Sequence, residues 1–377
     1  MAVLTLGSGA KRYVRNFNWS LALACVLVSF IGVICIQSAD LHSPDAANEF
    51  RKQLLYIGLG TPLMIGFALI DYRNWQRWAP ALYGLNLVLL LSILRGGHSA
   101  LGAQRWISLG PLGTFQPSEP AKLVLAIAIA AVLCRGRYDR LQDLWKPLAV
   151  VGIPALLIVK QPDLGTALVI LAILTAQLFF GLPKLGDFAV YMMGIFVTAA
   201  TAVGTNVVLK PFQKARLFVF LNPKADPQGA GYNLNQSKIA VGNGEWLGRG
   251  LHHGTQTQLN FVPEHSRDFI FTVLAEEFGF VGAAGLIVLY SVILFGGIRA
   301  MLTARDRFGF LLASGLVAMF TFHILINIGM TIGIMPITGI PLPFMSYGGS
   351  AILTNFAAVG VLLNIYSQKD RDVLGNA

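Results

Sequence analysis

The carboxylate of Asp268 is the first candidate for chemistry, because charged and aromatic residues surround it in the segment 263–271. A carboxylate with a raised pKa is suited to general-base catalysis. Phe269 and Phe271 are expected to lower the local dielectric and raise the pKa of Asp268, whereas Arg267 acts in the opposite direction. The alternative stays open that Asp268 simply caps the long apolar helix that follows it.

A second group of candidates lies around the start of the apolar run 119–135. Glu119 and Lys122 are three residues apart and therefore share one face of a helix. They form either a local ion pair on a helix capped by Ser118, or a charged pair at the mouth of a membrane helix, which is costly and marks a functional site. Arg105, together with the positive end of this helix, is suited to holding a phosphate.

Two further segments carry unusual polar chemistry. Asp163 lies between two apolar runs, where it either caps the next helix or contributes to a site. Segment 210–268 contains Arg216, a turn-rich stretch and a short amphipathic helix that includes Gln236 and Ser237. Its glycine-rich part does not have the spacing of a dinucleotide motif. It predicts either flexible backbone near a polar ligand or an ordinary flexible loop.

Prolines and glycines interrupt the apolar pattern between residues 335 and 350, a segment that ends at Ser350. Irregular backbone at membrane depth is tolerated only inside the protein or along a water-filled cavity. We therefore expect this segment to line the same cavity as the other candidates.

Several other polar residues have simpler explanations. His252, His253 and His265 lack the spacing of a zinc site, so no metal site is predicted from them. His323 and Asn327 are one helical turn apart and are expected to bond to neighbouring helices. The three cysteines fall in or beside apolar runs and are expected to be core residues rather than a disulfide framework.

The elements that position these residues must be membrane helices. Apolar residues make up 55% of the chain, charged residues only 12%, and the mean hydropathy is +0.64. A soluble chain carries about 25% charged residues. The apolar runs predict an all-α integral membrane protein, with residues 1–377 forming one polytopic domain of about ten transmembrane helices. These lie near 18–38, 53–70, 78–94, 119–135, 147–160, 165–181, 187–209, 269–298, 309–334 and 349–367.

The distribution of lysine and arginine predicts the orientation of these spans. Basic residues concentrate in the connections on the side that also holds both termini, which the positive-inside rule assigns to the cytoplasm. Connections 95–118, 210–268 and 335–348 then face the outside, and 210–268 is a large extracytoplasmic loop between the seventh and eighth helices. The same rule accounts for the net charge of +10, so nucleic-acid binding is not expected.

Together, these segments resemble the SEDS family (shape, elongation, division and sporulation), whose members polymerise cell-wall glycan. Each motif is weak alone, but their order and spacing are specific over residues 19–366. The residues around Asp163 and Glu276 resemble the elongation branch more than the division branch. The matching motifs are Arg105-Trp106, Gln116-Pro117-Ser118-Glu119 with Lys122, Gln161-Pro162-Asp163-Leu164-Gly165-Thr166, Gly231-Tyr232 with Gln236-Ser237, Gly248-Arg249-Gly250, Pro263-Glu264 with Asp268-Phe269-Ile270-Phe271, and Pro341-Leu342-Pro343-Phe344 with Ser346-Tyr347-Gly348-Gly349-Ser350.

The resemblance implies an inverting peptidoglycan glycosyltransferase that polymerises lipid II at the outer face of the bacterial cytoplasmic (inner) membrane during cell elongation. It implies that Asp268 is the essential general base, and that Glu119 orients Lys122. Cationic side chains or a divalent cation, Mg or Mn, would stabilise the pyrophosphate. The full set of expected substrate-binding residues is Arg105, Glu119, Lys122, Asp163, Arg216, Gln236, Ser237, Glu264 and Ser350.

The resemblance also implies partners: lipid II, membrane lipids, a class B penicillin-binding protein that acts as transpeptidase, and other elongation-complex proteins. In one respect the chain departs from the family, because Ser266-Arg267 replaces the usual His-Thr before the aspartate. Two rival functions remain, a lipid II flippase and a non-catalytic scaffold for the transpeptidase. A flippase needs charges along a transbilayer pathway, whereas the polar residues here are predicted to gather on one side.

Overall fold

The computed structural model describes residues 16–39, 46–96, 98–100, 103–108, 110, 114–136, 138, 140–205, 211–222, 226, 229–259, 261–262 and 264–369. Each predicted span overlaps one long helix in this part of the chain, which confirms the all-α membrane fold. These helices are α2 (Trp19–Ala39), α3 (Ala46–Leu69), α4 (Tyr72–Gly96), α5 (Ser118–Arg135), α6 (Trp145–Lys160), α7 (Leu164–Gly181), α8 (Leu185–Gly204), α12 (Ile270–Leu302), α13 (Arg307–Ile332) and α14 (Gly349–Ser367).

Helix α5 differs from the other long helices because three charged residues fall within its 18 residues. Within the described residues, nine helices are long and apolar enough to cross a membrane, and α5 is not among them. Its 18 residues include Glu119, Lys122 and Arg135. The helix packs against α4, α6, α7, α13 and α14, and most of its side chains are buried. The charged pair therefore lies in a protein interior instead of against lipid.

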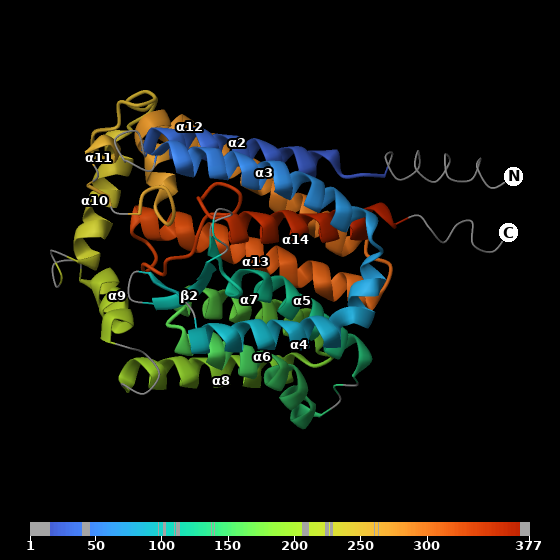
Figure 1. The fold of residues 1–377 in the computed structure, drawn as a ribbon. Coiled ribbons are helices and arrows are strands. Elements are labelled where there is room, and N and C mark those ends of the chain that lie inside the picture. The colour runs from blue at the N-terminus through green and yellow to red at the C-terminus, as the bar shows by residue number, and fades with distance from the viewer. Residues whose placement is uncertain are drawn as a thin grey trace, which may run out of the picture.

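The long helices run roughly parallel to one another (Figure 1). Helix α3 packs on α14, α12 on α2 and α13, and α13 on α7. The start of α2 and the end of α14 lie at one end of the bundle (Figure 1). The opposite end, which we call the site end, carries the short helices α9 (Pro211–Leu221), α10 (Ala230–Asn243) and α11 (Thr255–Gln258). Helix α10 corresponds to the short helix predicted around Gln236.

A small antiparallel sheet, which the sequence did not predict, lies at the site end. Its strands are β1 (His98–Ala100), β2 (Ala103–Ser108) and β3 (Thr114–Phe115), in the order β1-β2-β3. Strands this short show no alternation of apolar and polar residues long enough to be recognised. The sheet places Arg105 in β2 and leads the chain from β3 into α5.

Helix α12 is broken at Gly279, where φ is 64° and ψ is −161°. The glycine-rich stretch 242–250 packs against this break. The main-chain N–H groups of Arg249 and Gly250 donate to the carbonyl oxygens of Glu276 and Glu277, at 2.9 and 3.0 Å. A Cβ atom on Gly244 or Gly248 would collide with the main chain of α12. The flexibility predicted for this stretch, whether near a ligand or in an ordinary loop, is therefore wrong, because its backbone is paired with α12.

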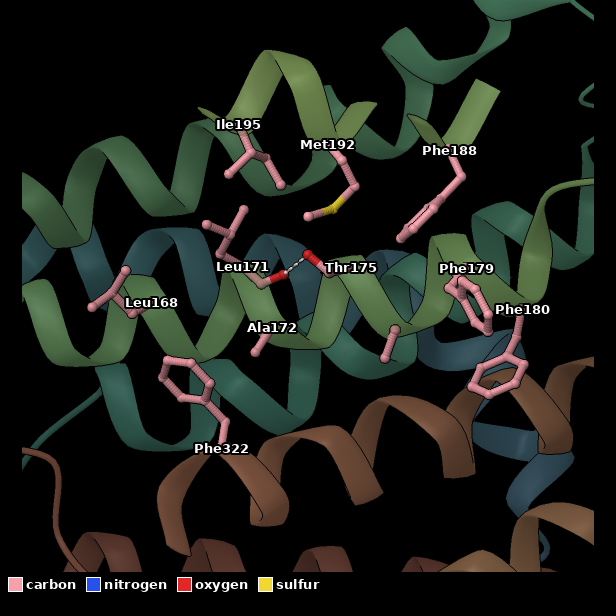
Figure 2. A pocket seen from close by; sticks show the side chains of 11 residues that line it. Leu168, Leu171, Ala172, Thr175, Phe179, Phe180, Phe188, Met192, Ile195 and Phe322 are labelled. Carbon is pink, nitrogen blue, oxygen red and sulfur yellow. Dashed lines mark hydrogen bonds between the residues drawn. The ribbon is translucent and has the colours of Figure 1, made fainter. Parts of the chain in front are cut away.

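Helices α7, α8 and α13 leave an apolar groove of about 480 Å³, lined by Phe188, Met192 and Phe322 among others (Figure 2). Helix α8 is held loosely, since Tyr191 is its only buried residue. The hydroxyl groups of Tyr191 and Thr175 lie 2.9 Å apart and link α8 to α7. This groove belongs to the spanning part of the bundle.

Candidate active site

Asp268 lies in the turn that precedes α12, and Phe269 occupies the N-cap position without any side-chain capping bond. The alternative that Asp268 is the helix cap is therefore wrong. The main-chain carbonyl oxygen of Asp268 accepts a hydrogen bond from the side-chain amide of Asn327, at 2.8 Å. The same amide nitrogen donates to the carbonyl oxygen of Ile340, at 2.7 Å. Helix α13 thus fixes the Asp268 turn and the segment 335–348 to each other.

The surroundings of Asp268 favour a carboxylate that exchanges protons near neutral pH. Desolvation raises the pKa of Asp268 to about 6, and the negative charge of Glu264 acts in the same direction. The positive charges of Arg216, Arg267 and Arg105 oppose this rise. The opposed effects of burial and Arg267 were predicted from the sequence, and both operate in the structure. A pKa near the working pH is the property that a general base needs.

Arg216 and Asp268 converge on Gly339. A Cβ atom at Gly339 would lie 3.1 Å from Asp268 Oδ2 and 3.7 Å from Arg216 Nη1. Arg216 lies on α9 and Gly339 in the irregular segment before α14, so three distant parts of the chain meet here. The arrangement places a base and a cation side by side, which suits a reaction that removes a proton and releases an anion.

Arg105 enters this region from the sheet. Its Nε donates to the carbonyl oxygen of Gln161 at 3.0 Å, its Nη2 donates to the carbonyl oxygen of Pro162, and its Nη1 lies 3.9 Å from Asp163 Oδ1. Arg105 is partly exposed. The cation is therefore anchored by the turn between α6 and α7 while it remains accessible to a ligand.

Asp163 has the capping role that the sequence left open, and its part in a site stays a prediction. It caps α7, because its Oδ1 accepts the N–H of Thr166 at 3.2 Å. Its Oδ2 also accepts bonds from the side chains of Gln116 and Ser118, at 3.1 and 3.0 Å. The predicted N-cap role of Ser118 is wrong, because the helix already includes Ser118 and the hydroxyl bonds to Asp163 instead. This network holds the starts of α5 and α7 together.

Ser350 joins the same network from α14, since its Oγ accepts the main-chain N–H of Gln116 at 2.9 Å. This bond ties the end of the irregular segment to the start of α5. Ser350 is buried. The structure therefore places Ser350 in the support of the site, close to Asp163 and its partners.

Glu119 and Lys122 form a buried ion pair, with Lys122 Nζ 2.8 Å from Glu119 Oε2. Lys122 Nζ also lies 3.3 Å from His323 Nε2, and His323 Nδ1 lies 3.1 Å from the carbonyl oxygen of Pro341. A carbonyl oxygen only accepts, so Nδ1 carries the proton and Nε2 accepts from Lys122. His323 and Asn327 bond to neighbouring elements as predicted, and through residues 340–341 they connect the ion pair to the Asp268 turn.

The segment before Asp268 is held on both sides. The hydroxyl of Ser266 donates to Glu49 Oε2 at 3.2 Å, and Arg267 Nη2 lies 3.7 Å from Glu49 Oε1. The carbonyl oxygen of Arg267 accepts a bond from Ser346 at 2.6 Å. Glu264 pairs with Arg267 at 3.3 Å. The two residues that replace the usual His-Thr thus attach the turn to α3 and to the 335–348 segment.

Two of the predicted site residues have no hydrogen bond to this group among those described. The buried hydroxyl of Ser237 donates to the carbonyl oxygen of Thr331 at 2.7 Å, which fastens α10 to α13. Gln236, its neighbour on α10, is half-buried. The hydrogen bonds described around Asp268 do not include either residue.

Sequence reasoning missed Glu49 and gave Asn327 no link to Asp268. Asn327 follows Asp268 by 59 residues, and Glu49 precedes Ser266 by 217 residues. One signal was present for Asn327, because a polar residue in a membrane helix needs a partner. Nothing in the sequence indicated that the Asn327 amide bonds to the main-chain carbonyl oxygen of Asp268.

The chain is similar to known proteins in both sequence and fold. The chain matches the FtsW/RodA/SpoVE family, described as cell cycle proteins, over residues 18–371. It is 38% identical over 320 residues to the peptidoglycan glycosyltransferase MrdB of Escherichia coli (strain K12), covering 85% of this chain and 86% of that protein.

Two solved structures are also similar. One is a chain from a structure described by the words "Structural coordination of polymerization and crosslinking by a peptidoglycan synthase complex". It has a TM-score of 0.81 and 30% identity, and the match covers 94% of this chain and 99% of that chain. The other is the rod shape determining protein RodA of Thermus thermophilus, with a TM-score of 0.70, 29% identity and coverage of 94% and 98%.

Proposed function

The chain belongs to the FtsW/RodA/SpoVE family, and we propose that it is a peptidoglycan glycosyltransferase that polymerises lipid II into glycan strands during cell elongation. The arrangement of Asp268 beside Arg216 and Arg105 supports this proposal most directly. The reaction requires a base for a sugar hydroxyl and positive charge for a leaving pyrophosphate. Both are present within one polar cluster at the site end.

In the proposed reaction, Asp268 removes the proton from the 4-hydroxyl of one lipid II molecule. The oxygen then attacks the anomeric carbon of the lipid-linked glycan, inverts it, and displaces undecaprenyl pyrophosphate. Pyrophosphate is a good leaving group, so no protein acid is needed. A pKa of about 6 leaves Asp268 mainly ionised at neutral pH and still basic enough to accept the proton.

Positive side chains would stabilise the charge that develops on the pyrophosphate. Arg105 and Arg216 are the candidates, because both act electrostatically on Asp268. Guanidinium groups suit this task since they stay ionised and bind phosphate through several donors. Lys122 is 1% exposed and bonded to Glu119 and His323. We therefore assign Lys122 a positioning role and leave direct pyrophosphate contact to the arginines.

A protein-held divalent cation does not fit the side chains that the structure describes. No group of three or more His, Cys, Asp or Glu in this part of the chain has the geometry for a metal ion. Near Asp268 the predominant charges are those of the three arginines. The mechanism proposed here assigns no step to a metal. An Mg or Mn ion, if used, would arrive on the pyrophosphate oxygens of the substrate.

The membrane setting completes the proposal. Orientation by the positive-inside rule puts the site end on the outer face of the bacterial cytoplasmic membrane. The apolar groove between α7, α8 and α13 is a candidate for an undecaprenyl chain, since all of its lining residues except Thr175 are apolar (Figure 2). The similar structure of a peptidoglycan synthase complex supports a class B penicillin-binding protein as the transpeptidase partner.

A polymerisation assay with the purified full-length protein in lipid vesicles tests the function. Fluorescent lipid II is supplied, and glycan products are separated on a gel, with and without the transpeptidase partner. We expect glycan strands from the unmodified chain and none from Asp268→Asn. The matched control is Asp143→Asn, a carboxylate at the opposite end of the bundle that pairs with Lys146 at 3.4 Å. This control should retain full activity.

Three outcomes would contradict the proposal. Glycan made by Asp268→Asn at the unmodified rate would remove the base. Transbilayer movement of lipid II without any glycan product would favour a flippase. Absence of glycan from the unmodified chain, together with equal stimulation of the transpeptidase by the unmodified chain and by Asp268→Asn, would favour a scaffold.

A further inference from the structure

The length of α12 locates the boundary of the bilayer on this helix. All 33 residues of α12 would rise about 50 Å as one straight helix, whereas the hydrocarbon core is about 30 Å thick. The break at Gly279 divides the helix, and residues 280–302 alone rise about 34 Å. This second part is sufficient for one crossing. Residue 280 therefore lies at the membrane boundary of the site end.

The side chains at this boundary are apolar and exposed. Phe280 is 60% exposed and Val281 is 57% exposed, although they follow a first part of α12 in which every residue except the half-buried Phe278 is buried. Exposure of this size on a membrane helix indicates contact with lipid. Apolar residues in the preceding part, such as Ile270 and Val273, are instead buried.

The turn that contains Trp246 and Leu247 lies beside Phe280 and Val281, at the same membrane boundary. The main-chain N–H groups of Phe280 and Val281 donate to the carbonyl oxygens of Glu245 and Trp246, at 2.9 and 3.1 Å. The rings of Trp246 and Phe280 meet edge-on, with centroids 5.2 Å apart. Main-chain bonds therefore fix the depth of the turn relative to the membrane helix.

This turn exposes more apolar surface than a water-facing loop would. Trp246 is 72% exposed and Leu247 is 80% exposed, the latter being the highest value among the exposed large apolar side chains of the described residues. The adjacent polar residues are Glu245 and Arg249, which pair with each other at 3.2 Å. Tryptophan beside paired charges is typical of the interface between hydrocarbon and lipid headgroups.

We propose that the turn at Trp246 and Leu247 is a membrane anchor that inserts into the interfacial region of the phospholipid leaflet at the site end. The turn contacts phospholipid, because the membrane-spanning part of α12 fixes the turn at the depth of the bilayer surface. The turn is already ordered by its bonds to α12, so insertion requires little further loss of conformational freedom. The anchor would hold the break in α12, and with it the first part of the helix, at the membrane surface.

Site-directed spin labelling tests the anchor without reference to catalysis. Cys25 and Cys35 are buried, and Cys134 is replaced by alanine so that it does not react. Single labels are placed at Leu247→Cys, at His253→Cys as an exposed control on the same loop, and at Val288→Cys, an exposed position of α12. The full-length proteins are reconstituted in vesicles of phosphatidylethanolamine and phosphatidylglycerol. Collision with oxygen is compared with collision with a water-soluble nickel chelate.

We expect the oxygen-to-nickel accessibility ratio at Leu247 to exceed that at His253 severalfold and to approach that at Val288. A ratio at Leu247 equal to that at His253 would overturn the anchor, since the turn would then lie in water. Protection of Leu247 from both reagents would also overturn it, because a protein surface would then cover the turn. As a second measurement, Trp246→Glu should reduce the oxygen-to-nickel ratio at Leu247, and an unchanged ratio would count against the proposal.

Discussion

The side-chain amide of Asn327 bonds at 2.8 Å to the main-chain carbonyl oxygen of Asp268, and the same nitrogen bonds at 2.7 Å to the carbonyl oxygen of Ile340. The proposed base is thus held through its backbone by a helix that provides no group for the reaction itself. One turn earlier on α13, His323 bonds in the same way to Pro341 at 3.1 Å. His323 and Asn327 therefore both bond to the segment that faces Asp268.

Replacement of Asn327 by leucine should therefore impair catalysis more than it impairs folding. Loss of the amide leaves two buried carbonyl oxygens unpaired, and each costs about 1–3 kcal/mol. We expect kcat to fall at least tenfold and the pH midpoint of activity to move. Asn364→Leu is the control, because Asn364 bonds the Ala68 carbonyl and the Tyr72 N–H at the other end of the bundle. It should cost similar stability and leave the pH midpoint unchanged.

The pH dependence of activity should report on Asp268. Only the ionised form accepts a proton, so activity should rise with pH through a midpoint near 6, the value to which desolvation raises the pKa of Asp268. Arg216→Gln removes a charge that lowers this pKa and should move the midpoint upward. Glu264→Gln removes a charge that raises it and should move the midpoint downward. Shifts in the same direction for both variants would contradict this electrostatic arrangement.

The same carboxyl group should make the folded chain less stable as the pH rises, whereas activity increases with pH. Its pKa is higher in the folded chain than the ordinary value of 3.8, so the folded chain binds this proton more tightly than the unfolded chain does. The contribution of Asp268 to stability is therefore fully present below about pH 4 and is lost as pH rises through 6. Thermal unfolding of Asp268→Asn compared with the unmodified chain between these pH values measures the effect. An unmodified chain that gains stability relative to Asp268→Asn over this range would refute it.

The ion pair of Glu119 and Lys122 should behave as a unit. Lys122→Met alone leaves a buried carboxylate without its cation and should destabilise the protein by about 3–5 kcal/mol. Glu119→Gln combined with Lys122→Met removes both charges, so it should recover much of this stability. Because Lys122 also contacts His323, we expect the double variant to remain poorly active. Thermal unfolding in detergent and the polymerisation assay separate the two effects.

Addition of one methyl group at Gly339 should inhibit the reaction directly. The new Cβ would lie 3.1 Å from Asp268 Oδ2, and the φ of 71° favours glycine. The backbone strain costs about 1–2 kcal/mol. Gly333→Ala is the control, since Gly333 has a similar φ of 81° and lies against Lys238 instead. We expect Gly339→Ala to lose far more activity than Gly333→Ala at equal loss of stability.

Much of the fold could be predicted, because each span is a long apolar run bounded by polar or glycine residues. The end of α6 and the start of α7 were located by Lys160 and Asp163, and Asp163 caps α7 as one interpretation required. The break in α12 could not be predicted. Gly279 lies in a continuous apolar run, and its conformation depends on main-chain bonds to residues 244–250.

The charged residues of the site could be predicted from their type. The roles of residues that depend on contacts between distant parts of the chain could not. Asp268, Arg105 and Arg216 belong together in the structure, since charges in a membrane protein concentrate where they are needed. Ser237 shares the same polar character, yet its hydroxyl only joins α10 to α13. A single sequence cannot distinguish these cases, because residue type does not reveal that Ser237 is buried and bonded to α13 whereas Arg105 stays partly exposed.

The apolar parts of α5 and α13 that lie between Lys122 and the opposite end of the bundle affect how protons can move. Between residues 123 and 133 of α5 and between 308 and 322 of α13, no side chain is ionisable. Protons released at the site end therefore have no relay along these two helices to the opposite side, and would pass to the water at the site end. Polymerisation should then carry no net current, so its rate should stay constant when the transmembrane voltage of the vesicles is set to zero or reversed.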